Sequence, residues 1–423
     1  MDILVVGSGG REHAIIKKLK ESPKTGRIYA MPGNGGIAAD AECVEIKTTD
    51  IVGVVAFAKE KAIDFVVVAP DDPLVLGMVD SLNEAGIPAF GPKKAAAAIE
   101  GSKVFSKWLM KKYGIPTADY ESFDDAQQAI AYLKQQNKYP AVIKADGLAL
   151  GKGVIIPENE ADAIKAVREM IEDGAFGDSG RRVVIEEFLT GVEVSVLAFT
   201  DGNIVVPMVS SMDHKRAYDN DEGLNTGGMG TIAPHPMYTP ELQARCMAEI
   251  FLPTIRAMKQ EGREFRGCLY FGLMLCAEGP RVIEYNCRFG DPETQVVLPL
   301  LEGDLLDIML ATAEGRLSDV KVGQKPGAAA CVIIASGGYP VAYQKGYAIH
   351  GLDAAGGAQN VTVYHAGTTL ENGVFKSNGG RVLGVAATGN TLKAALDTAY
   401  GATAGIGFKN SFYRHDIGKK VLY

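Results

Sequence analysis

The strongest candidates for chemistry in this sequence lie in residues 281–294, RVIEYNCRFGDPET. The apolar start of this segment predicts a strand, and side chains two residues apart on a strand point to the same face. Glu284 and Asn286 therefore project together as two hard oxygen donors, which suits Mg²⁺ when nucleotide phosphates supply its other ligands. Arg288 follows the strand and is a catalytic candidate, because its guanidinium can neutralise a carboxylate or a transferring phosphoryl group. A purely structural polar ladder is the alternative interpretation.

A second segment, residues 141–153 with the sequence AVIKADGLALGKG, places Lys144 on a strand beside a glycine-rich hairpin. This lysine and the hairpin at Gly151, Lys152 and Gly153 can surround the phosphates of a nucleotide with cations and free amides. The P-loop consensus is absent, so a P-loop nucleotide site is not predicted. A solvated turn is the alternative.

Adjacent carboxylates interrupt an apolar strand at residues 183–193, VVIEEFLTGVE. The change at Glu186 and Glu187 indicates a hinge, where backbone groups could bind the edge of an adenine. Glu193 could accept hydrogen bonds from ribose hydroxyls. A strand that ends in solvated acids is the alternative.

Residues 7–13, GSGGREH, follow a predicted strand and open a predicted helix. Backbone amides and a helix N-terminus favour anions, so Gly9, Gly10 and Arg11 are candidates for binding a phosphorylated small substrate. A dinucleotide site would require an acid about 20 residues further on, but the second strand ends in AMPGNGG at 30–36, without Asp or Glu. NAD binding and a structural turn are the alternatives.

A basic cluster, DHKR at 213–216, is followed by NTGGMG at 225–230. A hydroxyl and several glycines beside the cluster suit a loop that encloses an anionic intermediate, with Asp213 and Lys215 as catalytic candidates. An ordinary solvated turn is the alternative.

The composition of the 423-residue chain excludes several classes of protein. Hydrophobic residues at 47% and charged residues at 22% predict a folded protein of roughly two to four domains. A net charge of -8 offers no positive field for nucleic acid, and the longest charge-free stretch, 326–344, is broken by Gly and Pro, so we expect no nucleic-acid partner and no membrane span. Because no signal-peptide pattern opens the chain and the six cysteines form no CxxC pair, we expect a cytoplasmic protein without zinc or disulfides.

The elements that must position these residues fall into three segments. Residues 1–102 alternate β-branched strands, at 3–6, 28–30, 44–46, 65–69 and 88–90, with amphipathic helices, which predicts a parallel sheet. Residues 103–325 begin with a helix near 103–113 and continue as hairpin strands around glycine turns, which predicts antiparallel pairing. Residues 326–423 carry short strands punctuated by glycine. The expected fold class is therefore α/β and α+β multidomain, with a parallel-sheet N-terminal domain and a small β-rich C-terminal domain.

These residues resemble the motifs of the ATP-grasp superfamily and, within it, of the glycinamide ribonucleotide synthetase family of purine biosynthesis. The matching motifs run through almost the whole chain in the family's order: GSGGREHA at 7–14, PGN at 32–34, PLV at 73–75, GIPTA at 114–118, VIKADGLALGKGV at 142–154, DHKR at 213–216, NTGGMG at 225–230, NCRFGDPETQ at 286–295, GGYP at 337–340, HAGT at 365–368 and GGRVLGV at 379–385. The resemblance implies that residues 103–325 form an ATP-grasp central domain, with ATP between two subdomains.

The resemblance also implies an ATP-dependent ligase that joins glycine to 5-phosphoribosylamine through glycyl phosphate. The chemistry is consistent, because a carboxylate acylates poorly until one oxygen becomes part of a phosphate, and phosphoryl transfer needs positioning and charge neutralisation. Carried over residue by residue, the resemblance implies Lys103 and Lys144 for the ATP phosphates, Glu186, Glu187 and Leu189 for adenine, Glu193 for ribose, Glu284 and Asn286 for Mg²⁺ or Mn²⁺, Gly9, Gly10, Arg11 and Asn34 for 5-phosphoribosylamine, and Arg288 and Glu293 near the acyl phosphate.

Some positions depart from the family pattern. The family often has Glu at Asp71, Ala at Gly35 and Pro at Leu224, and residues 272–275 lack the further acid of a second metal site. The alternatives at this point are an ATP-grasp ligase or carboxylase for another phosphoribosyl purine precursor, a nicotinamide-dependent oxidoreductase, and a nucleotide-binding regulator without turnover. We expect a monomer or weak homo-oligomer.

Overall fold

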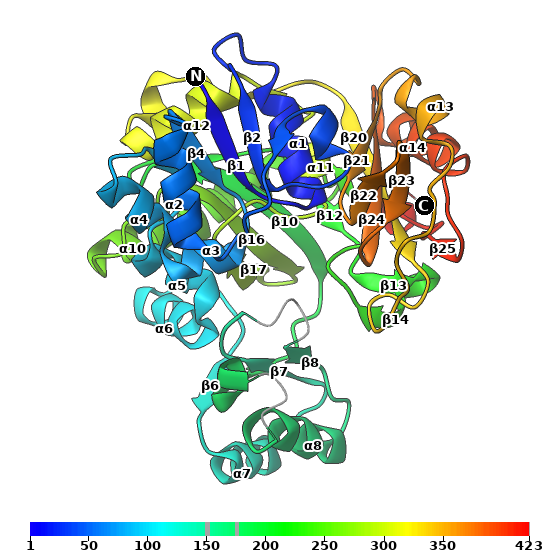
Figure 1. The fold of residues 1–423 in the computed structure, drawn as a ribbon. Helices are drawn as coiled ribbons and strands as arrows, with labels where there is room; N and C mark the ends of the chain where they lie inside the picture. The colour runs from blue at the N-terminus through cyan, green and yellow to red at the C-terminus, as the bar shows by residue number, and fades with distance from the viewer. Residues whose placement is uncertain (149–152, 174–176, 423) are drawn as a thin grey trace.

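The computed structural model describes residues 1–148, 153–173 and 177–422. Most of the chain forms one body, from which a small lobe projects (Figure 1). This lobe begins at β6 (Tyr120–Phe123) and ends at β9 (Val183–Glu187). Within the described ranges, no helix has the length and apolar character needed to cross a membrane.

The N-terminal domain contains the predicted parallel sheet, with strand order β3-β2-β1-β4-β5. Its main strands are continuous apolar runs because both faces of the sheet are covered. The strands are β1 (Ile3–Gly7), β2 (Ile28–Pro32), β3 (Glu42–Cys43), β4 (Phe65–Val68) and β5 (Ala89–Phe90), and the helices are α1 (Gly10–Leu19), η1 (Ile37–Ala39), α2 (Ile51–Glu60), α3 (Asp71–Leu76), α4 (Met78–Glu84) and α5 (Lys94–Gly101).

The third strand differs from the prediction. A strand was expected at 44–46, but β3 lies at Glu42–Cys43 and pairs with Tyr29 and Ala30 of β2. The ladder cannot extend far beyond this point because β2 ends at Pro32, which has no N–H group to donate.

The central region begins with α6 (Lys103–Tyr113), the helix predicted from the sequence. The Ser102 hydroxyl accepts a hydrogen bond from the Phe105 N–H at its start, and Gly114, with φ of 66°, ends it in the left-handed conformation. In the small lobe the antiparallel sheet has the order β6-β9-β7-β8, and two helices pack on it through one apolar cluster. The remaining elements of the lobe are α7 (Ala126–Gln136), β7 (Ala141–Ala145), β8 (Val154–Ile155), α8 (Glu160–Ile171) and η2 (Gly177–Arg181).

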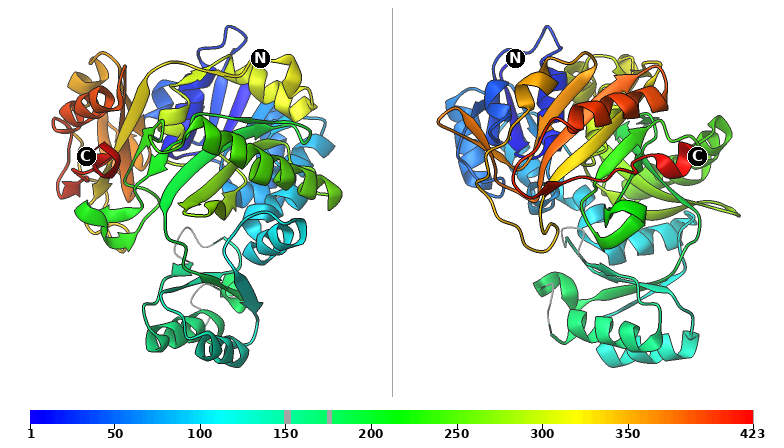
Figure 2. Two further views of the ribbon diagram at one scale, coloured as in Figure 1. Left: turned by 180° about the vertical axis from the view of Figure 1, so that it is seen from behind. Right: turned by 90° about the vertical axis from the view of Figure 1, so that its right-hand side faces the viewer.

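A larger antiparallel sheet, of order β11-β10-β16-β17, lies above the small lobe in the view of Figure 1. Its apolar side shares a core with the N-terminal parallel sheet and with the helices that Figure 2 shows in front of it in the left view. These elements are β10 (Val192–Thr200), β11 (Val205–Pro207), α9 (Pro240–Cys246), the π-helix η4 (Met247–Phe251), α10 (Leu252–Gln260), β16 (Gly267–Cys276) and β17 (Gly279–Asn286). Because the two sheets share one core, they hold the side chains at their edges in fixed relative positions.

The C-terminal sheet, of order β12-β15-β20-β24-β21 with β25 on β20, contains strands from both sides of residue 326. Helix α14 (Leu392–Thr403) covers its outer face, as the right view of Figure 2 shows. Its strands are β12 (Met212–Asp213), β15 (Gly230–Ala233), β20 (Ala328–Ser336), β21 (Val361–His365), β24 (Arg381–Gly389) and β25 (Ser411–Phe412). The other elements here are β13 (Arg216–Tyr218), η3 (Asp219–Asp221), β14 (Glu222–Asn225), α11 (Thr294–Val297), β18 (Leu301–Glu302), α12 (Leu305–Glu314), η5 (Leu317–Asp319), β19 (Gly323–Gln324), α13 (Leu352–Gly356), β22 (Thr368–Glu371), β23 (Val374–Ser377) and α15 (Lys419–Leu422).

Candidate functional site

Glu284 and Asn286 lie at the end of β17, on the side of the strand opposite the buried Tyr285. The alternation expected from the sequence is therefore observed. A bulge at Ile283 shifts the pairing of β17 with β16, and the Ile283 carbonyl accepts a hydrogen bond from Lys144 Nζ at 3.1 Å. The bulge thus brings a cation from the small lobe to the strand that carries the two oxygen donors.

The Glu284–Asn286 pair fits a divalent ion that takes its other ligands from phosphate. In residues 1–148, 153–173 and 177–422, no group of three or more His, Cys, Asp or Glu side chains is arranged to hold a metal. Two hard oxygen donors are the set that Mg²⁺ or Mn²⁺ uses beside a polyphosphate. Burial alone would raise the pKa of Glu284. The charges of Lys215, Lys144 and other nearby cations lower it by more than burial raises it, so its pKa is below the ordinary value. The carboxylate is therefore ionised at neutral pH.

Lys103 reaches the same region from the first turn of α6. Its Nζ donates to the Gly147 carbonyl at 2.9 Å. The neighbouring Ser102 hydroxyl donates to Asp146 at 3.0 Å, which ties the start of α6 to the end of β7, the strand of Lys144. Two candidate phosphate-binding lysines, Lys103 from α6 and Lys144 from β7, are thus close enough to Glu284 to lower its pKa.

The side chain of Glu186 lies in a buried ion-pair cluster with two lysines. Lys107 Nζ is 2.8 Å from Glu186 Oε2, and Lys144 Nζ is 3.0 Å from Oε1. Burial lowers the pKa of Lys107 to about 8, against the charge of Glu186, which raises it. The sequence analysis missed Lys107, although its spacing of four from Lys103 places both on one face of the helix. Glu186 therefore fixes the position of Lys144 through its carboxylate.

The other residues predicted to surround adenine lie around the junction of the lobe and the central sheet. Glu187 is exposed and accepts a hydrogen bond from Arg281 of β17 at 2.7 Å. Leu189 is half-buried in the turn between β9 and β10, and Gly153 directly precedes β8. Gly151 and Lys152 lie outside the described residues.

Lys215 joins the two acids that the sequence analysis treated separately. Its Nζ lies 3.3 Å from Glu193 Oε2 and 3.8 Å from Glu284 Oε1. The charge of Glu193, followed by that of Glu284, raises the pKa of Lys215. The lysine comes from a long hairpin, residues 212–233, so this hairpin supplies a cation to the edge of the central sheet.

Arg288 is held by carboxylates from the N-terminal domain. Its Nη2 lies 3.0 Å from Glu100 Oε1 and 3.5 Å from Asp71 Oδ2, and it donates to Asn286 Oδ1 at 3.3 Å. Asp71 therefore supplies a carboxylate here although the family often has Glu. The Arg288 Nε is buried and has no hydrogen-bond partner among the described residues.

Asp213, half-buried at the base of the hairpin, lies near the buried carboxylate of Glu293. Burial, followed by the charge of Glu293, raises the pKa of Asp213 well above its usual range. Ser195 donates to Glu293 Oε1 at 3.4 Å. Gly228, with φ of 115°, passes so close that a Cβ there would lie 2.6 Å from Asp213 Oδ1. Only glycine fits this approach of the hairpin to the acid.

The glycine loop at Gly9 contains an internal acid that the sequence analysis did not assign. Glu12 Oε2 accepts the Gly9 N–H at 2.6 Å and so uses one amide of the loop. The amides of Gly10 and Arg11 belong to the first turn of α1, which has no earlier carbonyl within the helix to bond them. The Arg11 side chain donates to the Ala69 carbonyl at 3.2 Å.

Asn34 uses its side chain to join loops of two domains. Its Nδ2 donates to the carbonyls of Ser8 at 2.8 Å and His365 at 2.9 Å. Its Oδ1 accepts the N–H groups of Gly36 and Ile37, both at 2.9 Å. All its side-chain donors are therefore engaged within the protein, which favours a positioning contribution over direct contact with a substrate.

Arg381, at the start of β24, is a further residue of this region that the sequence analysis did not single out. Its guanidinium donates to the carbonyls of Gly227 and Asp291, both at 2.6 Å, and its Nη2 lies 3.5 Å from the Asp291 carboxylate. It therefore links the hairpin to the loop after β17. The signal was present, because Arg381 belongs to the GGRVLGV motif.

A separate cleft of about 550 Å³ lies between α1 and the β21–β24 edge of the C-terminal sheet. Lys17 and Lys20 in its wall pair with Asp40, and Lys18 pairs with Glu21. Its lysines are thus neutralised within the protein, and the cleft does not contain the candidate residues described above.

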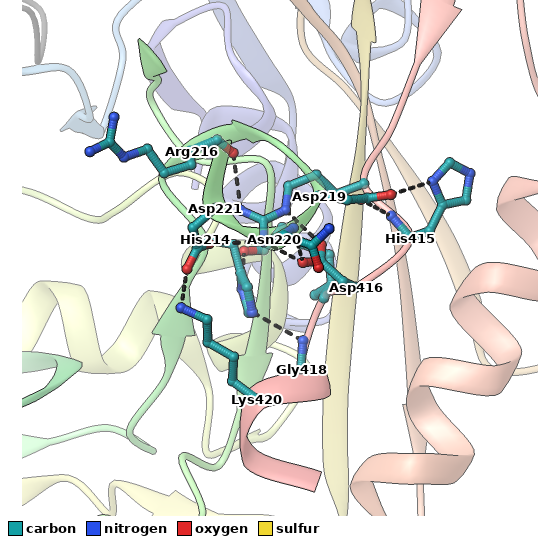
Figure 3. Close-up of polar contacts among 12 residues, drawn as sticks. His214, Arg216, Asp219, Asn220, Asp221, His415, Asp416, Gly418 and Lys420 are labelled. Carbon is teal, nitrogen blue, oxygen red and sulfur yellow. Dashed lines mark hydrogen bonds and ion pairs between the residues drawn. The ribbon is translucent and has the colours of Figure 1, made fainter. Parts of the chain in front are cut away.

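His214, between Asp213 and Lys215, is buried and neutral. The Gly418 N–H donates to its Nε2 at 3.0 Å, so its proton lies on Nδ1, 3.1 Å from the Gly230 carbonyl (Figure 3). Burial, followed by the charge of Arg414, lowers its pKa to about 4.

This shift predicts acid destabilisation. Between about pH 6.5 and about pH 4 the unfolded chain binds a proton at His214 that the folded chain does not, so the free energy of unfolding falls as the pH falls, by roughly 3 kcal/mol. Replacing His214 with Gln is expected to flatten the decrease in melting temperature between pH 7 and pH 4.5. The same replacement at the exposed His350 serves as control, and an unchanged pH slope in the His214 variant would contradict the assignment.

Fold and site together define a protein of the ATP-grasp class, in which several cations meet the candidate metal ligands Glu284 and Asn286 between a small lobe and a central sheet. The structure is similar, with a TM-score of 0.73 at 18% identity, to the biotin carboxylase domain of 2-oxoglutarate carboxylase from Hydrogenobacter thermophilus in complex with MgADP, over 97% of this chain and 91% of that one. This likeness concerns the fold alone.

Three family models match the chain: phosphoribosylglycinamide synthetase N domain at residues 1–100, its ATP-grasp (A) domain at 101–294 and its C domain at 329–420. The chain belongs to the phosphoribosylglycinamide synthetase family. The resemblance and the fold class predicted from the sequence are thereby confirmed, and the nicotinamide-dependent alternative loses its support.

Similar proteins align with this chain over nearly their whole length. The phosphoribosylamine–glycine ligase of Vibrio vulnificus is 47% identical over 100% of this chain and 99% of its own, and that of Rhizobium meliloti is 48% identical with the same coverage. The crystal structure of phosphoribosylamine–glycine ligase from Thermotoga maritima matches with a TM-score of 0.84 at 33% identity, over 99% of this chain and 100% of that one.

Proposed function

We propose that this chain is an ATP-dependent ligase that joins glycine to 5-phosphoribosylamine through glycyl phosphate. The products would be glycinamide ribonucleotide, ADP and phosphate, in de novo purine biosynthesis. The observation that carries the proposal is the group of four cations, three lysines and Arg288, that lowers the pKa of Glu284 beside Asn286. Several cations that face one two-oxygen metal site suit the negative charge of a triphosphate. The relatives are phosphoribosylamine–glycine ligases, which supports the choice of substrates.

In this proposal Glu284 and Asn286 would hold Mg²⁺ or Mn²⁺, which would offset the negative charge of the phosphates. Lys103 and Lys144 bind the ATP phosphates, and Glu193 accepts from the ribose. Arg288 stabilises the phosphoryl group as it moves from ATP to the glycine carboxylate.

The second half-reaction forms the amide. The amine of 5-phosphoribosylamine attacks the acyl carbon of glycyl phosphate and phosphate leaves. The glycine loop with Gly9, Gly10 and Arg11 binds the phosphate of 5-phosphoribosylamine at the start of α1, and Glu293 lies near the acyl phosphate. A cytoplasmic location and a monomeric or weakly self-associating state, expected from the sequence, belong to the same proposal.

A coupled assay of ADP release tests the function. We expect ADP only when ATP, a divalent metal, glycine and freshly generated 5-phosphoribosylamine are all present, with each component omitted in turn. ADP release that instead depends on formate or bicarbonate would favour another ATP-grasp enzyme of the purine pathway. No turnover under any of these conditions would reject the ligase.

A further inference from the structure

The long hairpin of residues 212–233 is anchored at both its base and its tip. At the base, β12 pairs with β15, which is part of the C-terminal sheet. At the tip, β13 and β14 meet at Asn220 and Asp221, whose φ angles of 59° and 55° are left-handed as in a type I′ turn. Lys215 lies between these two ladders. A two-stranded ribbon is marginal on its own, so its tip needs external support.

The C-terminal tail, residues 411–420, supplies this support through Arg414. The Arg414 side chain is 1% exposed, and its Nη2 lies 2.9 Å from Asp221 Oδ1. Its Nη1 donates to the Arg216 carbonyl at 3.1 Å, one residue after Lys215. On its own segment it forms two 2.8 Å hydrogen bonds with Asp416. One guanidinium therefore fixes the backbone beside Lys215 and the turn at the tip.

The rest of the tail repeats this contact (Figure 3). Asp416 accepts the Asn220 N–H at 2.8 Å, the His415 N–H donates to Asp219 at 2.7 Å, and Lys420 pairs with Asp221. These contacts involve every residue of η3, so the position of the C-terminal tail determines the position of the turn.

We propose that Arg414 is a positioning residue for the active site: through Asp221 and the Arg216 carbonyl, the C-terminal tail sets the place of Lys215 between Glu193 and Glu284. This inference rests on the proposed function, in which those two acids serve the ribose and the metal. Lys215 crosses from the C-terminal sheet to the central sheet, so a small shift of the hairpin moves its ammonium out of reach of both carboxylates.

The test uses Asp221→Asn and Arg414→Ala in the full-length protein, each with and without Lys215→Met. Asp221→Asn keeps the shape of the side chain and a residue type that tolerates the left-handed conformation, so it covers the case in which Arg414→Ala does not fold. Lys419→Ala removes an exposed cation from the same tail and is the matched control.

We expect each single variant to lower kcat for ADP release by about 10-fold or more, with little change in the KM for 5-phosphoribosylamine. In the Lys215→Met background the same changes are expected to lower kcat less than about two-fold further, because a positioning residue cannot act through a group that is gone. The Lys419 control should match the wild type.

Two results would overturn the proposal: a folded Asp221→Asn protein with wild-type kcat, or full additivity with Lys215→Met. The same double-mutant cycle with Lys215→Met can be measured without turnover, from the ATP affinity of each variant by calorimetry. An inactive wild type would therefore reject the proposed function while the effect of the tail on Lys215 is still measured.

Discussion

Replacement of Glu284 with alanine is expected to lower turnover by about 10²- to 10³-fold with little loss of thermal stability. Its side chain is 33% exposed and therefore contributes little to core packing, whereas its charge faces Lys215 at 3.8 Å. The carboxylate therefore contributes to charge balance when the metal and nucleotide are present. Activity and melting temperature are measured on the same preparations.

Metal dependence separates this explanation from a general loss of activity. For Glu284→Gln we expect the Mg²⁺ concentration at half-maximal activity to rise at least about 10-fold, because an amide is a weaker ligand than a carboxylate. Glu278→Ala, an exposed acid on the turn between β16 and β17, is the control. Near-normal turnover with an unchanged Mg²⁺ requirement would show that Glu284 does not hold the metal.

The local features of this site could be predicted from the sequence because they depend on neighbouring residues. The alternation of Glu284, Tyr285 and Asn286 follows from a strand, and the limits of α6 follow from Ser102 and Gly114. The family resemblance then added the order of the domains. Each of these inferences needs only a few consecutive residues or the known order of the family's motifs.

The partners of the site residues could not be predicted in the same way. Lys107 stands in a lysine-rich helix and has the appearance of a solvated side chain until Glu186 is brought to it. Arg414 lies in a charged tail whose contacts are about 200 residues away in sequence, with Asp221 as its ion-pair partner. Ion pairs between distant segments depend on how the sheets pack, which local pattern does not determine.

Glu186 carries the second large expected effect, on stability. Its carboxylate is the shared ion-pair partner of two buried ammonium groups, those of Lys107 and Lys144, whose side chains are 2% and 5% exposed. Replacement with Gln removes the counter-charge and leaves both cations with neutral partners only, such as the Thr117 hydroxyl for Lys107 and the Ile283 carbonyl for Lys144. Breaking a buried pair in this way costs about 3–5 kcal/mol. For a unit of the size of the small lobe this corresponds to a fall in melting temperature of roughly 12–40 °C. Glu187→Gln, at the exposed neighbouring acid, should change it by only a few degrees.

The cause is tested by pH and by a second substitution. Because the pKa of Lys107 is already lowered to about 8, the unfolded chain binds more protons than the folded one between about pH 8 and the ordinary lysine value, so stability contributed by this group rises with pH there. Without Glu186 that window extends to lower pH, and the Gln variant should recover part of its stability between pH 7 and pH 9. Lys107→Met should restore most of the lost melting temperature in the Gln background, since it removes one unpaired cation. A Gln variant that stays equally destabilised at both pH values and with Lys107→Met would assign the loss to packing and not to charge.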